Sequence, residues 1–236
     1  MTRSRIIGTF LRDHAEAVAS VLDVGCGTGE LILRFGSQAD ICAGIDISKL
    51  ALKTGSKKLK AASFLLADAT AIPIRERIFD LVICSEVMEH LERDGEAVGE
   101  ISRVLKDDGS AVFTAPCNPK YWTVEDAADG HLRRYRTADF AHILRSKGLR
   151  IEKLWTWGFP TAYLFRRYVS TRLFSASLHK PMTQGRARAV RLMAQFLTYI
   201  FRFDDRFVRL GLGIGIVTIA GKERTSKKDD HSTQTK

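Results

Sequence analysis

The sequence of 236 residues predicts an α/β protein with a mostly parallel sheet and helices on both of its faces. Two observations carry this prediction. Short apolar segments alternate with amphipathic ones between residues 20 and 154, and strands that are separated by helices pair in parallel. The first apolar segment ends in glycines spaced G-x-G-x-G, a turn that lets a ligand approach the backbone at the end of a strand.

The hydrophobic pattern places the elements in order along the chain. An amphipathic N-terminal helix is expected over residues 5–19, and a final strand follows a long helical insert. Strands are expected at about 20–25, 41–46, 63–67, 79–84, 109–115, 149–154 and 212–220, and helices at about 29–36, 49–60, 93–106 and 137–147.

Local signals mark several of these boundaries. Ser48 is a good N-cap for the helix that begins after it. The pair Asp108-Gly109 predicts a turn that ends the helix over 93–106. Thr137 is expected to cap the next helix, and Gly148 is expected to end it.

The net charge of +10 is concentrated in one part of the chain. Residues 1–154 hold 22 basic and 22 acidic side chains, whereas residues 155–210 hold 10 basic and 2 acidic ones. A neutral core argues against the broad basic footprint of a nucleic-acid-binding protein. The longest apolar run is too short to span a bilayer, and no secretion signal is apparent, so a cytoplasmic protein with reduced cysteines is expected.

Four motifs identify a family by resemblance. The run VLDVGCGTGE at residues 21–30 resembles the first motif of the class I S-adenosylmethionine-dependent methyltransferases, of the methyltransferase type 11 kind. The next motifs follow in order, and the match covers roughly residues 20–154: AGIDIS at 43–48, LADATAIP at 66–73 and FDLVICSEVMEHL at 79–91. The resemblance implies a Rossmann-like seven-stranded sheet whose last strand is antiparallel, with S-adenosylmethionine as the cofactor.

The resemblance also implies which residues contact that cofactor. The backbone of Gly25 and Gly27 would line its methionine part, Asp46 would accept both ribose hydroxyls, and Asp68 would bond the adenine amino group. For both aspartates the alternative is an ordinary acid in a turn at a strand end. The expected cofactor-binding set is Asp23, Gly25, Cys26, Gly27, Asp46, Ile47, Asp68, Ala69 and Ser85.

Candidate catalytic and metal-binding residues lie after the fourth and fifth strands. His131 is the best general-base candidate because its usual pKa suits proton transfer near neutrality. It could equally be a metal ligand, or a loop histidine that anchors a lid. Glu86, Glu89 and His90 have the spacing of one side of a helical turn, where they could hold a divalent cation or only fix the turn by hydrogen bonds.

The basic segment predicts a helical insert or lid over residues 155–210 within a methyltransferase domain over 1–221. Its clearest helix, over 186–203, has arginines on one face and apolar side chains on the other. Three roles remain open: contact with an anionic membrane through residues 160–203, recognition of an acidic acceptor, or a dimer or cap helix. The polar tail over 222–236 is expected to be disordered.

These features together predict a methyltransferase that acts on a small-molecule or lipid-like acceptor, at oxygen. The expected location is the cytoplasm, with peripheral contact at the membrane surface. Two alternatives stay open. One is a non-catalytic module that binds S-adenosylmethionine and docks a membrane or partner. The other is an RNA-end methyltransferase, which a metal requirement would favour. The acceptor and the oligomeric state are not determined by the sequence.

Overall fold

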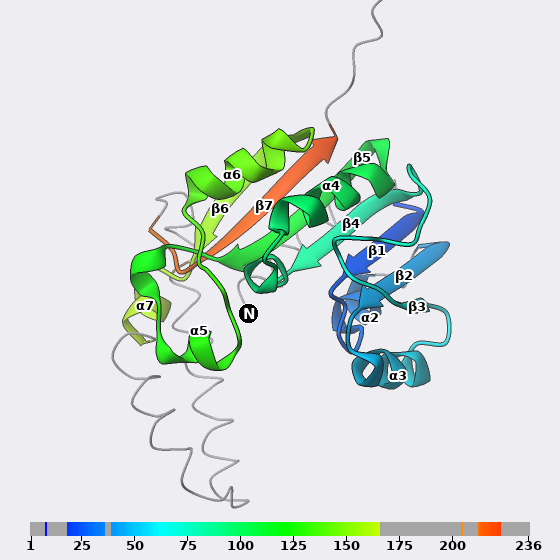
Figure 1. Ribbon diagram of the computed structural model, residues 1–236, viewed down its shortest axis with the longest axis horizontal. Helices are drawn as coiled ribbons and strands as arrows, with labels where there is room; N and C mark the ends of the chain where they lie inside the picture. The colour runs from blue at the N-terminus through cyan, green and yellow to red at the C-terminus, as the bar shows by residue number, and fades with distance from the viewer. Residues whose placement is uncertain (1–7, 9–17, 36–38, 166–203, 205–211, 223–236) are drawn as a thin grey trace, which may run out of the picture.

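The structure is a computed structural model that describes residues 8, 18–35, 39–165, 204 and 212–222. Seven strands form one sheet in the order β3-β2-β1-β4-β5-β7-β6 (Figure 1). The strands are β1 (Ser20–Val24), β2 (Ile41–Asp46), β3 (Ser63–Leu66), β4 (Phe79–Ser85), β5 (Leu105–Pro116), β6 (Leu149–Trp157) and β7 (Gly215–Lys222).

The pairing directions confirm the predicted fold class. Strands β1 to β5 pair in parallel, and β7 runs antiparallel between β5 and β6. The strand order reverses between β1 and β4, so the chain leaves their carboxyl ends in opposite directions, and sheets of this kind bind ligands in the crevice that this creates. Most of the expected basic insert (166–203 and 205–211), the expected N-terminal helix and the tail from residue 223 lie outside the described residues.

Helices cover both faces of the sheet. In Figure 1, α4 and α6 lie in front of the strands, and the contacts place α4 on β5 and α6 on β6. Helices α2 and α3 pack against β2 at the other end of the sheet. The described helices are α2 (Glu30–Phe35), α3 (Lys49–Lys58), η3 (Met88–His90), α4 (Asp94–Val104), η4 (Pro119–Tyr121), α5 (Val124–Ala128), α6 (Thr137–Ser146) and α7 (Thr161–Phe165).

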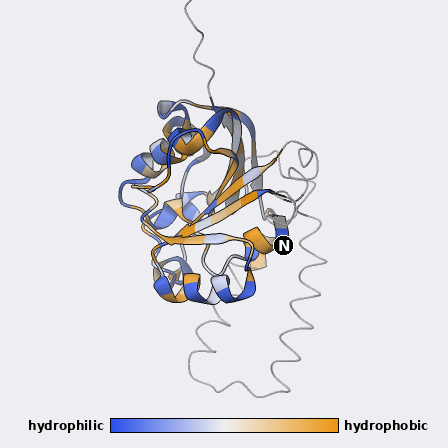
Figure 2. Ribbon diagram, turned by 90° about the vertical axis from the view of Figure 1, so that its right-hand side faces the viewer, coloured by the Kyte–Doolittle hydropathy of each residue, from blue (hydrophilic) through white to orange (hydrophobic). Residues whose placement is uncertain are grey.

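The core lies on both sides of the central strands, because successive side chains of a strand point to opposite faces. On β1, Leu22 joins the cluster beneath α4 and α6, whereas Val21 joins a second cluster with Leu31 of α2. All five residues of β1 are buried. Figure 2 shows the same distribution, with hydrophobic strands inside and hydrophilic helix surfaces outside.

Most predicted boundaries agree with the structure, but one helix end was wrong. Ser48 caps α3 as expected, since its hydroxyl oxygen accepts a bond from Ala51 N at 3.3 Å. Helix α4 ends at Val104, because the buried Leu105 already pairs with Phe79 and starts β5. The Asp108-Gly109 pair therefore lies inside β5, in the irregular stretch before regular pairing resumes.

A second correction concerns the start of α6. Thr137 is the first helical residue, and Arg136 occupies the N-cap position without a side-chain bond. The predicted end is confirmed, since Gly148 has the left-handed φ of +74° that is typical of a residue after a helix. Strand β6 continues to Trp157, and β7 begins at Gly215 rather than 212.

Candidate active site

The glycine turn after β1 is held against the end of β2. Gly25 N and Cys26 N both donate to Ile45 O, at 2.8 and 3.0 Å. Asp46, the last residue of β2, accepts from Gly27 N through Oδ2 at 2.8 Å and from Ser48 N through Oδ1 at 2.7 Å. Because a carboxylate has about four acceptor sites, both oxygens keep a lone pair for a ligand.

A cavity of about 250 Å³ opens beside this turn, at the carboxyl ends of the strands. Its acidic groups belong to Asp46, Asp68 and Glu86, and its basic group is the imidazole of His90. Among the described residues that line it there is no lysine or arginine, which suits a cationic ligand better than a phosphorylated one. The lining residues are Gly25, Ile45, Asp46, Ile47, Ala67, Asp68, Ala69, Glu86, Val87, His90 and Leu91.

Asp68 in the cavity wall and Asp23 behind the glycine turn have pKa values shifted in opposite directions. Asp68 is exposed, and bonds from Thr70 N and Thr70 Oγ1 to its Oδ1 hold its pKa below the ordinary value. Asp23 is buried behind the glycine turn, and burial, with the nearby charge of Asp46, raises its pKa to about 8. Its Oδ2 has no hydrogen-bond partner among the described residues, so it is a candidate for the amino group of a ligand.

Ser85, the last residue of β4, and Glu86, the residue after it, belong to a short chain of hydrogen bonds. Thr114 on β5 is fully buried and donates its hydroxyl to Glu86 Oε1 at 2.8 Å. Because the Thr114 hydroxyl proton is donated to Glu86, the Thr114 hydroxyl oxygen accepts a hydrogen bond from Ser85 Oγ, also at 2.8 Å. Glu86 holds this position with a φ of +57°, a strained conformation that is uncommon for non-glycine residues and concentrated at functional sites.

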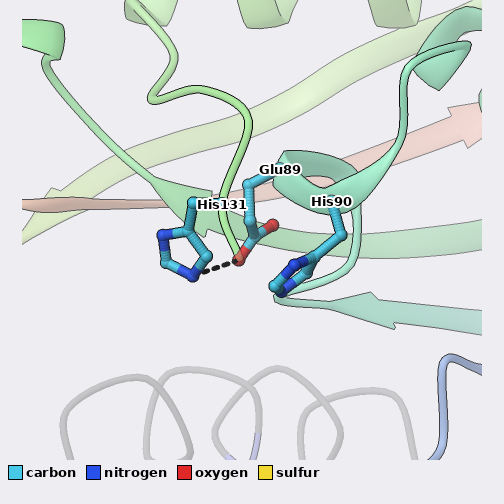
Figure 3. A group of neighbouring side chains, drawn as sticks. All are labelled: Glu89, His90 and His131. Atoms are coloured by element: carbon cyan, nitrogen blue, oxygen red, sulfur yellow. Dashed lines mark ion pairs between the residues drawn. The ribbon is translucent and has the colours of Figure 1, made fainter. Parts of the chain in front are cut away.

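The predicted trio of Glu86, Glu89 and His90 does not come together as expected. The side chain of Glu86 is bonded to Thr114, and the group that converges is Glu89, His90 and His131 (Figure 3). One ligand atom from each of these three side chains lies within 4.8 Å of the others. The reason is local geometry: the positive φ of Glu86 breaks the turn before the short helix η3, so i, i+3 and i+4 do not share one face.

His131 is positioned by a buried ionic pair that the sequence analysis missed. Asp126 Oδ1 accepts from His131 Nδ1 at 3.0 Å and from Arg134 at 2.8 Å, and the side chains of Asp126 and Arg134 are completely buried. Arg134 also donates to the carbonyls of Cys117 and Ile214, which ties this loop to the ends of β5 and β7. The sequence signal that could have indicated the position of Asp126 is a capping-box pattern, Thr-x-x-Asp over 123–126, at the start of α5.

The structure brings part of the predicted cofactor set into the cavity wall. Gly25, Asp46, Ile47, Asp68 and Ala69 line it. The other four, Asp23, Cys26, Gly27 and Ser85, lie outside the lining. The apolar wall formed by Ile45, Ala67, Val87 and Leu91 was not predicted from the sequence.

A model of a methyltransferase domain matches residues 22–113, which include the glycine turn and all of the described cavity lining. The chain carries a class I S-adenosylmethionine-dependent methyltransferase domain. S-adenosylmethionine is the cofactor of this family, and the acidic cavity without lysine or arginine among its described lining residues fits that cation.

The relatives of this methyltransferase domain are distant. YcgJ of Bacillus subtilis, an uncharacterized methyltransferase, is 24% identical over 61% of this chain and 62% of its own. The malonyl-[acyl-carrier protein] O-methyltransferase of Buchnera aphidicola is 32% identical over 47% and 45%. The ubiquinone biosynthesis O-methyltransferase of Nitrosomonas europaea is 28% identical over 55% and 63%. The chain spans 39 to 63% of the length of the curated relatives it matches.

Solved structures confirm the methyltransferase fold. The crystal structure of YcgJ superposes with a TM-score of 0.61 at 19% identity, covering 92% of this chain and 97% of that one. The [4+2]-cyclase SpnF also has a TM-score of 0.61 at 19% identity, covering 88% of this chain and 76% of its own. A cyclase and a methyltransferase on one fold show that the fold does not decide the reaction. Within the described part of the chain, no helix is both long enough and apolar enough to cross a bilayer.

Proposed function

We propose that the protein transfers the methyl group of S-adenosylmethionine to an oxygen of a small-molecule or lipid-like acceptor. The acidic cavity beside the glycine turn carries this proposal. Methyl transfer from a sulfonium is an in-line displacement, so the main task of the protein is to hold the cofactor and the acceptor in position. Names among the relatives agree with oxygen as the target, since they include malonyl-[acyl-carrier protein], tocopherol and ubiquinone biosynthesis O-methyltransferases.

In this proposal the residues around the cavity divide the work of binding the cofactor. Asp46, fixed by the Gly27 and Ser48 amides, takes the two ribose hydroxyls. Asp68, on the loop after β3, takes the adenine amino group. Asp23, behind the turn, binds the amino group of the methionine part of the cofactor. The backbone of Gly25 and Gly27 lies along that methionine part. Cys26, Ile47, Ala69 and Ser85 complete the cofactor site.

His131 is the proposed catalytic residue of the metal-free protein and takes the proton of the acceptor hydroxyl. Its Nδ1 is bonded to Asp126, so Nε2 is the nitrogen that is available to accept a proton. Asp126 is also paired with Arg134, which holds the aspartate in place beside the imidazole. Loss of a general base typically lowers turnover by about 10²- to 10⁴-fold.

The basic segment supports a lipid-like acceptor. Residues 155–210 contain 10 basic and 2 acidic side chains, and clustered basic residues attract anionic lipid headgroups. We place the reaction in the cytoplasm, with residues 160–203 in peripheral contact with the membrane. Nucleic acid is not the proposed partner, because residues 1–154 are neutral.

Transfer of labelled methyl groups tests the function directly. The purified protein is incubated with labelled S-adenosylmethionine and with lipid, small polar, RNA and protein fractions of cells. The proposal predicts label in the lipid or small-molecule fraction and acceptor-dependent formation of S-adenosylhomocysteine. Asp46→Ala should abolish binding of the cofactor in calorimetry, whereas His131→Gln should bind it normally and lose turnover.

Other outcomes would refute parts of the proposal. Label in RNA alone would replace the acceptor class with RNA ends. Tight binding without label in any fraction would favour a non-catalytic module. Full activity of His131→Gln would remove the base assignment. If the protein does not sediment with anionic liposomes at low salt, the membrane contact is wrong.

A further inference from the structure

Both histidines next to Glu89 have one ring nitrogen committed to an acceptor. His90 Nδ1 lies 3.2 Å from the carbonyl oxygen of Gly130, and His131 Nδ1 lies 3.0 Å from Asp126 Oδ1. A carbonyl or carboxylate oxygen only accepts, so each Nδ1 carries the proton. In the neutral ring the lone pair is then on Nε2. Two imidazoles are therefore set in the tautomer that binds a metal through Nε2.

These rings converge with the carboxylate of Glu89. The side chain of Glu89 is completely buried, and its Oε1 lies 3.9 Å from His131 Nε2. The two rings stand edge to face, with their centroids 4.9 Å apart. Figure 3 shows Glu89 and His90 from η3 and His131 from the loop between α5 and α6, with the His131 ring facing the Glu89 carboxylate. A backbone bond from Leu132 N to Glu89 O, at 2.8 Å, fixes that loop against η3.

We propose that Glu89, His90 and His131 bind one divalent transition-metal ion of the zinc type. The set of two imidazoles and one carboxylate favours zinc or a similar ion, because magnesium and calcium prefer oxygen ligands. Tetrahedral ligands about 2.0–2.1 Å from zinc lie about 3.4 Å from one another. One ligand atom of each side chain lies within 4.8 Å of the others, so metal binding would have to bring these atoms closer by up to about 1.4 Å.

The groups around this site are those that metal-bound histidines use. A ligand histidine usually donates its second ring nitrogen to a carboxylate or a backbone carbonyl. His131 does so to Asp126, and His90 does so to Gly130. Arg134 forms an ion pair with Asp126, and the same aspartate orients the His131 ring. Glu86 belongs to the cavity and to Thr114 rather than to this site.

The site adjoins the cofactor cavity, since His90 lines it. Given the proposed function, an acceptor hydroxyl that binds an ion at Glu89, His90 and His131 would have its pKa lowered. The ion and the proposed base would use the same lone pair of His131. Metal binding is therefore measured without cofactor or acceptor, so that its failure is distinct from failure of the transferase function.

The test uses the full chain after removal of metal by a chelator. Co²⁺ and Zn²⁺ are titrated in separate experiments, and visible absorption of Co²⁺, calorimetry and metal analysis after gel filtration are recorded. The inference predicts one equivalent per chain and a Co²⁺ spectrum of imidazole and carboxylate ligands. His90→Gln should weaken binding by at least tenfold, and Asp126→Asn should weaken it by about 10- to 100-fold.

Matched controls exclude effects of folding and of stray surface ligands. His142 is an exposed histidine on α6, so His142→Gln should leave binding unchanged. His90 is also exposed, and its replacement should not alter the unfolding temperature of the metal-free protein. Equal binding by wild-type protein, His90→Gln and Glu89→Gln would overturn the inference. So would the absence of one bound equivalent of either ion in folded wild-type protein.

Discussion

Replacing Gly25 by alanine should destabilise the fold in two ways, through backbone strain and through steric overlap with a neighbouring side chain. Gly25 has a φ of +70°, and an added Cβ would overlap the Cγ2 of Val87. Gly27 has a similar φ of +54°, but a Cβ there would meet nothing within 4 Å. Gly27→Ala is therefore a matched control, because it carries the backbone strain without the overlap.

The magnitudes follow from these two contributions. A non-glycine residue in the left-handed region costs about 1–2 kcal/mol. Overpacking against Val87 adds about 1–3 kcal/mol, since a β-branched side chain has few alternative rotamers. We expect Gly25→Ala to lower the free energy of unfolding by about 2–5 kcal/mol and Gly27→Ala by about 1–2 kcal/mol.

Urea unfolding measures these free energies, and a double-mutant cycle assigns the difference to Val87. In a Val87→Ala background, the cost of Gly25→Ala should fall to that of Gly27→Ala. Because Gly25 and Val87 both line the cavity, Gly25→Ala should also weaken binding of S-adenosylmethionine in calorimetry. If Gly25→Ala costs no more than Gly27→Ala, or costs the same in both backgrounds, the overlap argument is wrong.

Two further predictions concern buried charges. Burial and Asp46 raise the pKa of Asp23 to about 8, so the folded protein holds this proton more tightly than the unfolded chain, whose ordinary value is 3.8. The free energy of unfolding without ligand should therefore fall as the pH rises from about 4 to about 8, and urea unfolding of Asp23→Asn should lack this part of the slope. A slope that persists in the variant would contradict the assignment. Arg134→Ala, which strands the buried Asp126, should lower the free energy of unfolding by about 3–5 kcal/mol, whereas Arg136→Ala at an exposed site should change it by less than about 0.5 kcal/mol. Equal effects of the two arginine variants would show that the pair does not stabilise the fold.

Elements set by short-range patterns were predictable. The alternation of apolar strands with amphipathic helices predicted the parallel sheet, and the glycine run predicted the turn at its carboxyl edge. Ser48 was recognised as a cap because an N-cap depends on the side chain at one position and on a backbone amide three residues later. The end of α4 was not predicted correctly, because it depends on the pairing of Leu105 with Phe79, which is distant in sequence.

The sequence by itself determined the family, the fold and the turn that the cofactor is expected to contact, because these depend on patterns within single segments. Only the tertiary structure decided which side chains converge beyond the cavity. Glu89 and His131 are far apart in sequence, and they meet because the loop after β5 returns to η3 and is held there by Asp126 and Arg134. Glu86 leaves that group because its backbone takes a positive φ and its carboxylate binds Thr114 on the adjacent strand. Helical spacing cannot reveal either event, since both depend on partners that only folding brings near.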